Sequence, residues 1–573
     1  MAWTALFMAV LAGADRLAHA AVCGNVGPKL VRVSGEYSKT PNSGLESAAY
    51  DKDSELWFAT TNGNNGKSCS LCMTQATSDT GQMVCFICKF EQCKSSEHNH
   101  DKARLRSRAA GRVSASTSVP FLEVWNFADR ALPRYVRTID LSGSSPSPVA
   151  PTSVASKHGL LAVAINVNDG ASPGLVQIGK PNVLGTSSAL LVDVGYLPDM
   201  VTFTPNGTTV LVANEGERQS GFDPDGSITC IRLDNRGSRL TYTKSTATFR
   251  AADGVTIPLG VRIFPENHAT PEKDIEPEYI AITADSKTAY VTLQENNAVA
   301  KLDVASCKVT DIFPLGTIDY SQVRFDPSDK NGIKLSTYDN PIVKGIFMPD
   351  TIGTFSVNGK PYFAIANEGD ARSGEEQPAK ILQQNTAEVK DTSRLEITLV
   401  DANGNAVPVA PATTVYSFGG RSMSIHDGTT GAQVFNSRDA IETLLAEPAY
   451  SAFYNSAHDK LDPDNRSEKK GPEPEGLLAA KVCGKQLVFV ALERAGGVMV
   501  WDASNPTAAV CTDYVNSRVD AVGMARDAGP ETIQLLPGDD LYEAYIAVPF
   551  EIGNHEHAPA TGSGSFSIFG ITC

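Results

Sequence analysis

The sequence lacks the features that mark two large classes of proteins. Beyond its first twenty residues it has no apolar run near the roughly 18 residues that a membrane-spanning helix requires. It also lacks an excess of basic residues, because 49 Lys and Arg stand against 65 Asp and Glu, which gives a net charge of −16. A nucleic-acid partner is therefore not expected, since phosphate binding needs a basic surface. Metal cations are the natural partners of so acidic a chain.

Several common catalytic motifs are also absent. The sequence contains no Walker loop, no GxGxxG after a strand and no HExxH. Ser422, Ser424, His426 and Asp427 stand close together, but neighbouring residues of a strand point to opposite faces, so this stretch does not predict a catalytic triad. Whether the chain is an enzyme stays open on this ground.

Composition and the N-terminus indicate an exported all-β protein. Glycine and proline are abundant, at 47 and 33 residues, and only 20% of residues are charged, which favours many short strands and turns. Residues 1–20 hold an apolar core followed by Ala18-His19-Ala20, the small-x-small pattern that a signal peptidase cuts. We expect a signal peptide at 1–20 and a mature, secreted or cell-surface protein.

Eleven cysteines include a cluster with CxxC spacing. Such spacing is typical of a zinc ribbon in the cytosol, whereas an oxidising compartment favours disulfides. Behind a signal peptide we expect disulfides, and zinc stays an alternative. The cluster consists of Cys69, Cys72, Cys85, Cys88 and Cys93.

Internal repeats predict the fold. Seven units read as strand, tight turn and strand, with hairpin chemistry such as Asn-Gly in the turns. A third strand follows in most of them. Repeated antiparallel units of this kind form a β-propeller, which leaves only short, protected sheet edges. The units begin near Gly44, Pro151, Pro198, Glu276, Met348, Glu473 and Gly529.

We therefore predict a single seven-bladed β-propeller domain over residues 21–573, with two insertions. Residues 63–120 form a Cys-rich and basic insertion in the first blade, and residues 371–470 hold an insertion with an acidic loop. The strand at 29–35 has no place in the first repeat unit. It is expected to supply the outermost strand of the last blade and so close the ring.

Acidic residues recur at two places in these units. One precedes the first strand and the other ends the second strand, 15 to 20 residues later. Because the two strands are antiparallel, both places lie at one edge of the blade. Six carboxylates at the first place and five at the second, eleven in all, are thus expected around one mouth of the channel. They are Glu46, Asp199, Glu278, Asp350, Glu475 and Glu531, with Glu215, Glu295, Glu368, Glu493 and Glu551; Ser153 takes the first place in the second unit.

This many like charges must be offset. At an effective dielectric constant of about 20, two of them about 4 Å apart repel by about 4 kcal/mol. Bound cations, raised pKa values or pairing with Arg218, Arg372 and Arg494 would relieve the repulsion. Oxygen ligands favour Ca²⁺ over Zn²⁺, so the metal alternative predicts a calcium site.

Other candidate sites are weaker. The acidic loop with Asp459, Asp462, Asp464, Asn465 and Glu468 resembles a Ca²⁺-binding loop without its glycine, and a solvated acidic loop is an equal alternative. His98 with His100, and His555 with His557, could chelate a transition metal but are more often simply solvated. Asn206 and Asn465 stand in sequons for glycosylation.

The sequence resembles the choice-of-anchor I family. The shared marks include "LPDMVTFTPNG", "DIEPEYIAITAD", "IANEGDAR", "DNRSEKKGPEPEG" and "GGVMVWD", in order between Lys29 and Ile571. The family includes cell-surface glycoproteins associated with biomineralisation and bacterial proteins named for alkaline phosphatase. The resemblance implies a seven-bladed propeller outside the cytoplasm. The segment 63–120 departs from the family pattern, so it inherits no role.

Two functional hypotheses follow. In the first, the protein is a secreted Ca²⁺-binding propeller that acts as an extracellular matrix or surface protein of the biomineralisation type. In the second, it is a metal-dependent phosphoesterase of the alkaline-phosphatase type, in which rim-bound metal activates water and Arg218, Arg372 or Arg494 clamps a phosphoester.

Overall fold

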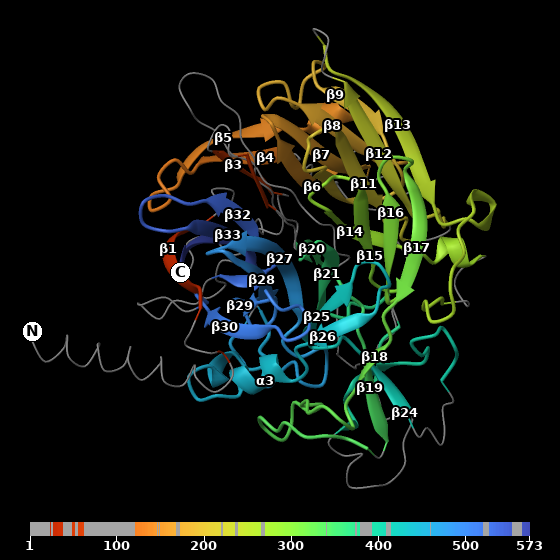
Figure 1. The fold of residues 1–573 in the computed structure, drawn as a ribbon, viewed down its shortest axis with the longest axis vertical. Coiled ribbons are helices and arrows are strands. Elements are labelled where there is room, and N and C mark those ends of the chain that lie inside the picture. Colours follow the sequence, from red (N-terminus) through yellow and green to blue (C-terminus); the bar gives the residue numbers. More distant parts are fainter. Residues whose placement is uncertain are drawn as a thin grey trace, which may run out of the picture.

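The computed structural model shows an all-β protein of mostly antiparallel, four-stranded sheets (Figure 1). Several predictions fall outside the described residues: the signal peptide at 1–20, Glu46, Asp459, the histidine pairs, and the segment 63–120 with its five cysteines. The structure describes residues 23, 27–37, 48–51, 56–61, 121–145, 147, 149–167, 172–218, 222–234, 239–264, 270–339, 341–372, 375–378, 392–407, 414–458, 460–518, 527–552 and 564–573.

Seven sheets follow one another along the chain, and we number them 1 to 7. Six have four strands in simple meander order. These are sheet 1, β2 (Ala48–Asp51), β3 (Leu56–Thr61), β4 (Phe121–Asn126) and β5 (Arg134–Asp140); sheet 2, β6 (Val149–Lys157), β7 (Leu160–Val167), β8 (Leu175–Gly179) and β9 (Leu190–Asp193); sheet 3, β10 (Pro198–Phe203), β11 (Thr209–Asn214), β12 (Ser227–Asp234) and β13 (Thr241–Thr248); sheet 4, β14 (Pro277–Ile282), β15 (Thr288–Leu293), β16 (Ala298–Asp303) and β17 (Lys308–Pro314); sheet 5, β20 (Ile352–Val357), β21 (Lys360–Asn367), β25 (Ser422–Asp427) and β26 (Gln433–Asn436); and sheet 6, β27 (Pro474–Val482), β28 (Lys485–Leu492), β29 (Val498–Asp502) and β30 (Val510–Val515).

Sheet 7 combines the two ends of the chain. Its strand β33 pairs with both β31 and β32, and the N-terminal strand β1 pairs antiparallel with the last strand β34. The register places Leu30 opposite Ile571. The strands of this sheet are β31 (Ala528–Pro530), β32 (Gln534–Pro537), β33 (Ala544–Ile552), β34 (Ser565–Thr572) and β1 (Lys29–Tyr37).

Turn chemistry fixes the hairpins that begin these sheets. In sheet 5 the two-residue loop Asn358-Gly359 has positive φ at both positions, 52° and 76°. That is the type I′ geometry, whose twist matches the twist of the paired strands and which glycine adopts without steric cost. The loop of sheet 2, His158-Gly159, has the same signs of φ. The expected hairpins are therefore present.

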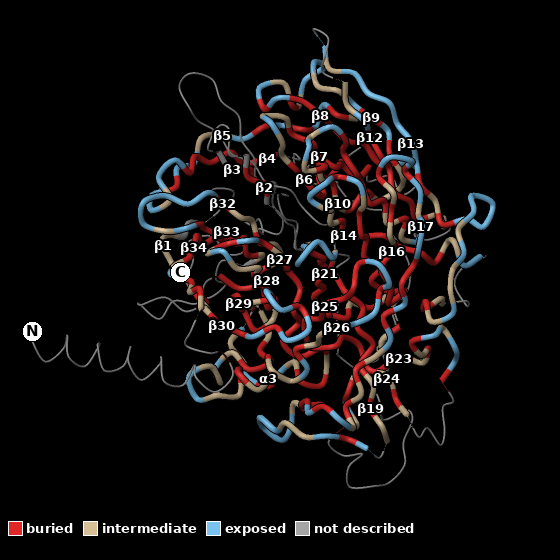
Figure 2. The backbone as a smooth tube through the Cα atoms, viewed as in Figure 1, coloured by how far each residue is buried: buried red, intermediate tan, exposed pale blue. Residues whose placement is uncertain are grey.

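The hydrophobic cores lie between neighbouring sheets. One cluster joins side chains of sheets 1, 2 and 7, and another joins sheets 3 and 4. Central strands such as β7 and β28 are buried along most of their length, whereas the outer strand β13 is largely exposed (Figure 2). Contacts between first strands pass from β2 to β6, β10, β14, β20, β27 and β32, and β32 also contacts β2.

The region 317–420 departs from the sequence prediction. The interval 371–470, predicted as an insertion with an acidic loop, contributes three strands to a separate five-stranded sheet, here called the accessory sheet, in which β19 and β24 pair in parallel. Short helices accompany it and the other loops. The accessory strands are β18 (Thr317–Asp319), β19 (Ile342–Ile346), β22 (Gln377–Pro378), β23 (Glu396–Thr398) and β24 (Thr414–Phe418); the helices are α3 (Ala440–Leu445), η1 (Ser142–Ser144), η2 (Ala251–Asp253), η3 (Pro271–Lys273) and η5 (Ser451–Phe453).

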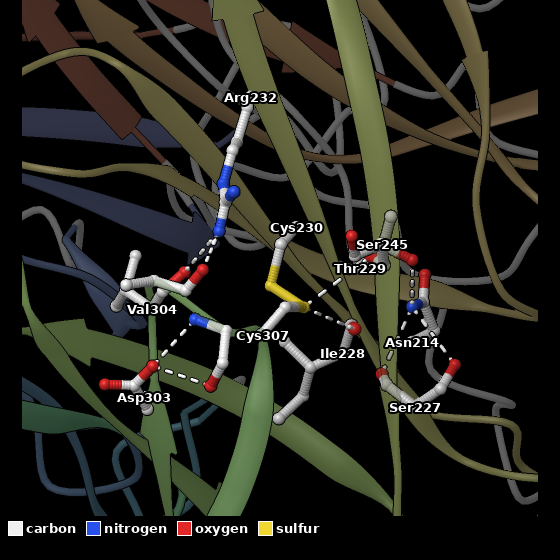
Figure 3. Close-up of a disulfide and its surroundings, with 12 residues drawn as sticks. Asn214, Ser227, Ile228, Thr229, Cys230, Arg232, Ser245, Asp303, Val304 and Cys307 are labelled. Atoms are coloured by element: carbon white, nitrogen blue, oxygen red, sulfur yellow. Dashed lines mark hydrogen bonds between the residues drawn. A yellow bond between two sulfur atoms is a disulfide. The ribbon is translucent and has the colours of Figure 1, made fainter.

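Three disulfides join sheets or hold chain ends. Cys230 of β12 bonds to Cys307, which follows β16, and so links sheets 3 and 4 (Figure 3). Beside this bond, Arg232 donates to backbone carbonyl oxygens of Val304 and Ala305. The other two disulfides, Cys23–Cys511 and Cys483–Cys573, attach both ends of the chain to sheet 6.

Candidate functional site

Backbone bulges orient the carboxylates that precede the first strands. In sheets 3, 4 and 6 the strand register shifts immediately after the proline of a Pro-acid pair, at Pro198, Pro277 and Pro474. A β-bulge leaves an extra residue outside the ladder and redirects its side chain. The acids at these bulges are Asp199, Glu278 and Glu475.

Sheet 2 carries the same bulge without an acid. Its register shifts between Pro151 and Ser153, so the bulged residue is Thr152. The sequence prediction placed Ser153 at this position, one residue too far, although Pro151-Thr152 matches the Pro-acid pairs of sheets 3, 4 and 6. Ser153 instead accepts a hydrogen bond from the backbone N–H of Val201, at 3.0 Å.

Most predicted rim carboxylates are buried. Glu475 and Glu493 are exposed by only 7% and 5%, whereas Glu215, Glu531 and Glu551 are partly exposed. Strand pairing brings the two acidic positions of a sheet together, as expected: Pro198 pairs with Asn214, next to Asp199 and Glu215. The remaining buried members of the predicted set are Asp199, Glu278, Glu295, Asp350 and Glu368.

The densest group of acids surrounds Glu475. Carboxylate oxygens of Glu475, Glu493 and Glu531 all lie within 4.8 Å of one another. The Glu475 carboxylate makes no hydrogen bond or ion pair with any residue that the structure describes. Burial, followed by repulsion from Glu531, Glu493, Glu368 and Asp350, raises its pKa well above the usual range. We call these five residues the Glu475 cluster.

Glu493 is shared by three possible ligand groups. Its carboxylate also lies within 4.8 Å of ligand atoms of His458 and Glu551, and separately of Glu368 and Glu473. His458 Nδ1 stands 3.0 Å from Glu493 Oε1 and 3.4 Å from Glu551 Oε2. The sequence analysis did not identify His458, because it lies in the 371–470 insertion, outside the repeated pattern.

Buried cations pair with acids in and beside the Glu475 cluster. Lys470 Nζ lies 3.0 Å from Glu368 Oε1, 2.7 Å from Asp370 Oδ1 and 3.3 Å from Glu473 Oε2. Glu473 also pairs with Arg466, at 2.7 Å, and these cations lower its pKa well below the usual value against the opposing effect of burial. Glu368 differs, since burial and nearby acids outweigh Lys470 and raise its pKa to about 7.

A second group of acids lies at sheets 3 and 4. Burial, followed by repulsion from Glu217, Asp199, Glu295 and Glu276, raises the pKa of Glu215 well above its usual value. We call these five residues the Glu215 cluster. Among the described residues, no three ligand atoms of this cluster approach one another as closely as those at Glu475.

In the two Glu-Pro-Glu segments, the two acids have different surroundings, and the difference is the same in both segments. The first acid of each meets cations: Glu276 Oε2 lies 2.9 Å from Arg372, as Glu473 lies beside Arg466 and Lys470. The second acid, Glu278 or Glu475, sits at the bulge. The sequence analysis assigned only the second acid to the rim and left the first without a role.

Arg372 and Arg494 are ion-paired rather than open to a phosphate. Arg372 contacts Glu276 and Asp274, at 2.9 and 3.4 Å, and is only 10% exposed. Arg494 contacts Glu473 and Glu493, at 3.0 and 2.9 Å. Arg218 is exposed. Of the three arginines predicted as a phosphate clamp, two are therefore held in ion pairs and the third lies at the surface.

The acidic loop is part solvent-facing and part packed. Asp462 pairs with Lys460 at 3.1 Å, with 46% of its own side chain exposed. Asp464 is buried and accepts a hydrogen bond from the Ser467 hydroxyl at 2.7 Å. Glu468 lies 3.6 Å from Arg394. In the described residues these three acids form no group with ligand spacing.

The remaining candidates have ordinary structural settings. Ser424 Oγ and His426 Nε2 lie 3.0 Å apart, but both residues are buried and His426 Nδ1 faces the Gly431 carbonyl rather than Asp427. Burial lowers the pKa of His426 to about 4. A Gly-x-Ser-x-Gly stretch at 170–174 leads into strand β8, not into the helix that a nucleophile elbow needs.

Both sequon asparagines lie at the surface. Asn206 is exposed in the turn between β10 and β11, and Asn465 is exposed in the acidic loop. Each side chain is thus accessible to a glycan, and whether either carries one stays a prediction.

A family model matches this chain over residues 104–506, and its description is the choice-of-anchor I domain. The chain belongs to the choice-of-anchor I domain family. The matched interval contains both carboxylate clusters except Glu531, together with His458 and Lys470.

Two curated proteins are similar to parts of this family member. One is the mesenchyme-specific cell surface glycoprotein of Strongylocentrotus purpuratus, 27% identical over 352 residues, which are 52% of this chain and 45% of that protein. The other is Gigasin-3a of Magallana gigas, 31% identical over 91 residues, 15% of this chain and 32% of that protein. The chain thus spans less than half the length of each.

Among solved structures, the chain is similar to the Cps50 (Swd1) β-propeller domain of Myceliophteria thermophila. The two are 7% identical, the match covers 95% of this chain and all of the other, and the TM-score is 0.40.

The family, the cell-surface relative and the three disulfides fit an extracellular or surface location, since disulfides form and persist in oxidising compartments. In the described part of the chain, no helix has both the length and the apolar character needed to span a bilayer.

Proposed function

We propose that this protein is a secreted, Ca²⁺-binding β-propeller of the cell surface or extracellular matrix, and that the Glu475 cluster holds the ion. The seven sheets would be the blades of a closed ring. Supporting this arrangement, contacts between first strands run in sheet order from β2 to β32 and return to β2, and β1 pairs with β34.

One observation carries the proposal: the Glu475 carboxylate is buried, and no cation of the described residues pairs with it. A carboxylate removed from water needs an opposite charge, hydrogen bonds or a proton. The neighbours of Glu475 are other acids, and two of them, Glu493 and Glu531, bring an oxygen within 4.8 Å of its own. A divalent cation between these three oxygens would compensate the charge of a carboxylate to which the described part of the chain offers no cation.

The chemistry of the ligands favours Ca²⁺. The group offers carboxylate oxygens and no thiolate, and hard oxygen ligands suit Ca²⁺. Ca²⁺ takes six to eight oxygen ligands in flexible geometry, so water and backbone carbonyl groups would complete a shell begun by three carboxylates. Glu531 is partly exposed and gives the ion a route from solvent.

A surface or matrix role rests on the relatives and on charge. One relative is named as a cell surface glycoprotein, and this chain carries a net charge of −16. An acidic surface with bound Ca²⁺ can bridge to other acidic matrix components or to a calcium mineral. The phosphoesterase hypothesis is not carried forward, because Arg372 and Arg494 already have carboxylate partners.

Calorimetric titration of the metal-stripped, full-length protein with CaCl₂ tests the proposal. We expect saturable binding with a Kd of about 10⁻⁴ to 10⁻³ M, the range of extracellular calcium modules. Glu475→Gln should weaken binding about tenfold or more, because it removes a charged ligand. Glu543→Gln is the matched control, since Glu543 is exposed at the far end of β33.

Two results would contradict the proposal. One is the absence of binding at millimolar Ca²⁺ in a protein whose thermal unfolding is unchanged. The other is equal affinity in the wild type and Glu475→Gln, which would place the ion elsewhere. Glu215→Gln separates the two clusters, because it should leave the affinity within about twofold of the wild type.

A further inference from the structure

A pocket of about 390 Å³ lies at the opposite end of the inner strands from the carboxylates. Four sheets contribute to it: Tyr50 from sheet 1, Ser156 and Lys157 from sheet 2, Lys481 and Val482 from sheet 6, and the β32–β33 turn of sheet 7. His158 adds an imidazole from the hairpin of sheet 2.

Strand β27 connects the two regions. Glu475 stands near its start and Lys481 near its end. At about 3.3 Å per residue, six residues separate them by about 20 Å. The pocket is therefore spatially independent of the Glu475 cluster, and the two regions have opposite charge chemistry.

The pocket holds cationic groups without partners. Neither Lys157 nor Lys481 makes an ion pair or side-chain hydrogen bond with any residue in the described ranges. The Ser156 hydroxyl is inaccessible to solvent and has no hydrogen-bond partner there. A buried hydroxyl without a partner is uncommon in native structures and calls for an explanation. Glu543 is the one carboxylate at the edge of the pocket, and it is exposed.

The inner wall of the pocket is apolar. Val482 and Leu536 are 4% and 1% exposed, and Tyr50 is 9% exposed. Arg130 donates a hydrogen bond to the Tyr50 hydroxyl at 3.0 Å, which fixes the ring against this wall. Small-molecule sites combine such apolar walls with a few convergent polar groups.

We propose that this pocket binds a small organic phosphate or sulfate ester. The two ammonium groups match the charge of a tetrahedral oxyanion, because lysine contacts phosphate-like groups as a mobile point charge with three donors. Tyr50, Val482 and Leu536 pack against the organic body, and the imidazole of His158 also lines the pocket. A phosphate and a sulfate ester share this chemistry, so the experiment separates them.

Calorimetry with phenyl phosphate and phenyl sulfate, each in EDTA, tests the proposal on the full chain. We expect one-to-one binding of at least one ester. The ester that binds more tightly shows whether the pocket takes a phosphate or a sulfate group. Lys157→Gln and Lys481→Gln should each weaken it about tenfold, since each removes a charge-assisted contact. Phenol, which keeps the ring and lacks the oxyanion, should bind far more weakly.

Two further variants sharpen the test. Lys287→Gln is the matched control, because Lys287 is an exposed lysine in the corresponding hairpin of sheet 4 and lies outside the pocket, so it should change nothing. Glu543→Gln should strengthen ester binding by removing a nearby negative charge, although it leaves Ca²⁺ binding unchanged.

Two outcomes would overturn the inference. One is the absence of binding of either ester at millimolar concentration. The other is binding that both lysine variants leave intact while circular dichroism shows them folded. Because the titrations contain EDTA, neither outcome depends on whether the Glu475 cluster binds Ca²⁺.

Discussion

The Glu475 cluster and the Glu215 cluster share a sequence pattern but differ in what the rest of the chain places beside them. Each contains a carboxylate whose pKa is raised by burial and by neighbouring acids. Near Glu475, the segment 458–473 adds His458, Lys470 and Glu473. There, ligand atoms form three groups of three, and within each group the atoms lie within 4.8 Å of one another. At Glu215 the described residues form no such group.

The difference shows that the ends of the strands place the carboxylates in both clusters. The insertion at 371–470 sets how densely charged groups are packed around them. Lys470 holds Glu368, Asp370 and Glu473 together from one side, and Glu475 is left facing other acids. In the Glu215 cluster, Arg372 reaches across to Glu276 and Asp274 instead. Three experiments test this difference.

Removing Lys470 should have the largest effect. Lys470→Met removes a cation that three carboxylates share, and breaking a buried ion pair in this way costs about 3–5 kcal/mol in the free energy of unfolding. Glu473 keeps its partners Arg466 and Arg494, so Glu368 and Asp370 are the acids that lose their cation. Arg372→Met should cost less, because it takes a cation from two acids rather than three. Urea denaturation in EDTA measures both.

Lys485→Met is the matched control for Lys470→Met. Lys485 is 40% exposed and pairs with Asp502, so its loss should cost less than about 1 kcal/mol. Equal losses in the two lysine variants would show that Lys470 does not hold the acids of this rim together.

The pH dependence of stability should show the next largest effect. A buried acid with a raised pKa favours the folded state below the unfolded value of 4.5 and loses that contribution as pH rises through the folded value, which is about 7 for Glu368. The metal-free protein should therefore become less stable from about pH 5 to about pH 8. Thermal unfolding across this range measures the loss.

Glu475→Gln and Glu215→Gln should each flatten this profile, because each removes an acid with a raised pKa. At high pH, saturating Ca²⁺ should raise the stability of the wild type to that of Glu475→Gln. It should leave the stability of Glu475→Gln itself unchanged. If Ca²⁺ instead restores stability equally in Glu475→Gln, the ion binds outside the Glu475 cluster.

The smallest effect is expected in the acidic loop. Asp462→Asn removes a carboxylate that is 46% exposed and already paired with Lys460, so the Ca²⁺ affinity should change by less than about twofold. A loss comparable with that of Glu475→Gln would move the calcium site from the buried acids to this loop.

Much of the fold could be predicted because its signals are local. Asn358-Gly359 predicts a type I′ hairpin, and the alternation around it predicts the paired strands. The pairing of β19 with β24 was missed, because residues 342–346 and 414–418 lie far apart in the sequence and carry no repeat signal. Thr152 was missed for another reason, since its unit carries no acid after the proline by which it could be matched to the others.

The local sequence places acids at the ends of paired strands, because strand periodicity and turn chemistry act over a few residues. Which acids are neutralised depends on tertiary packing. Lys470 reaches Glu368 across 102 positions of sequence, and Arg372 reaches Asp274 across 98. Such pairs form through space after the sheets pack, so no local pattern reveals that Glu473 meets cations while Glu475, two residues later, has no cation partner among the described residues.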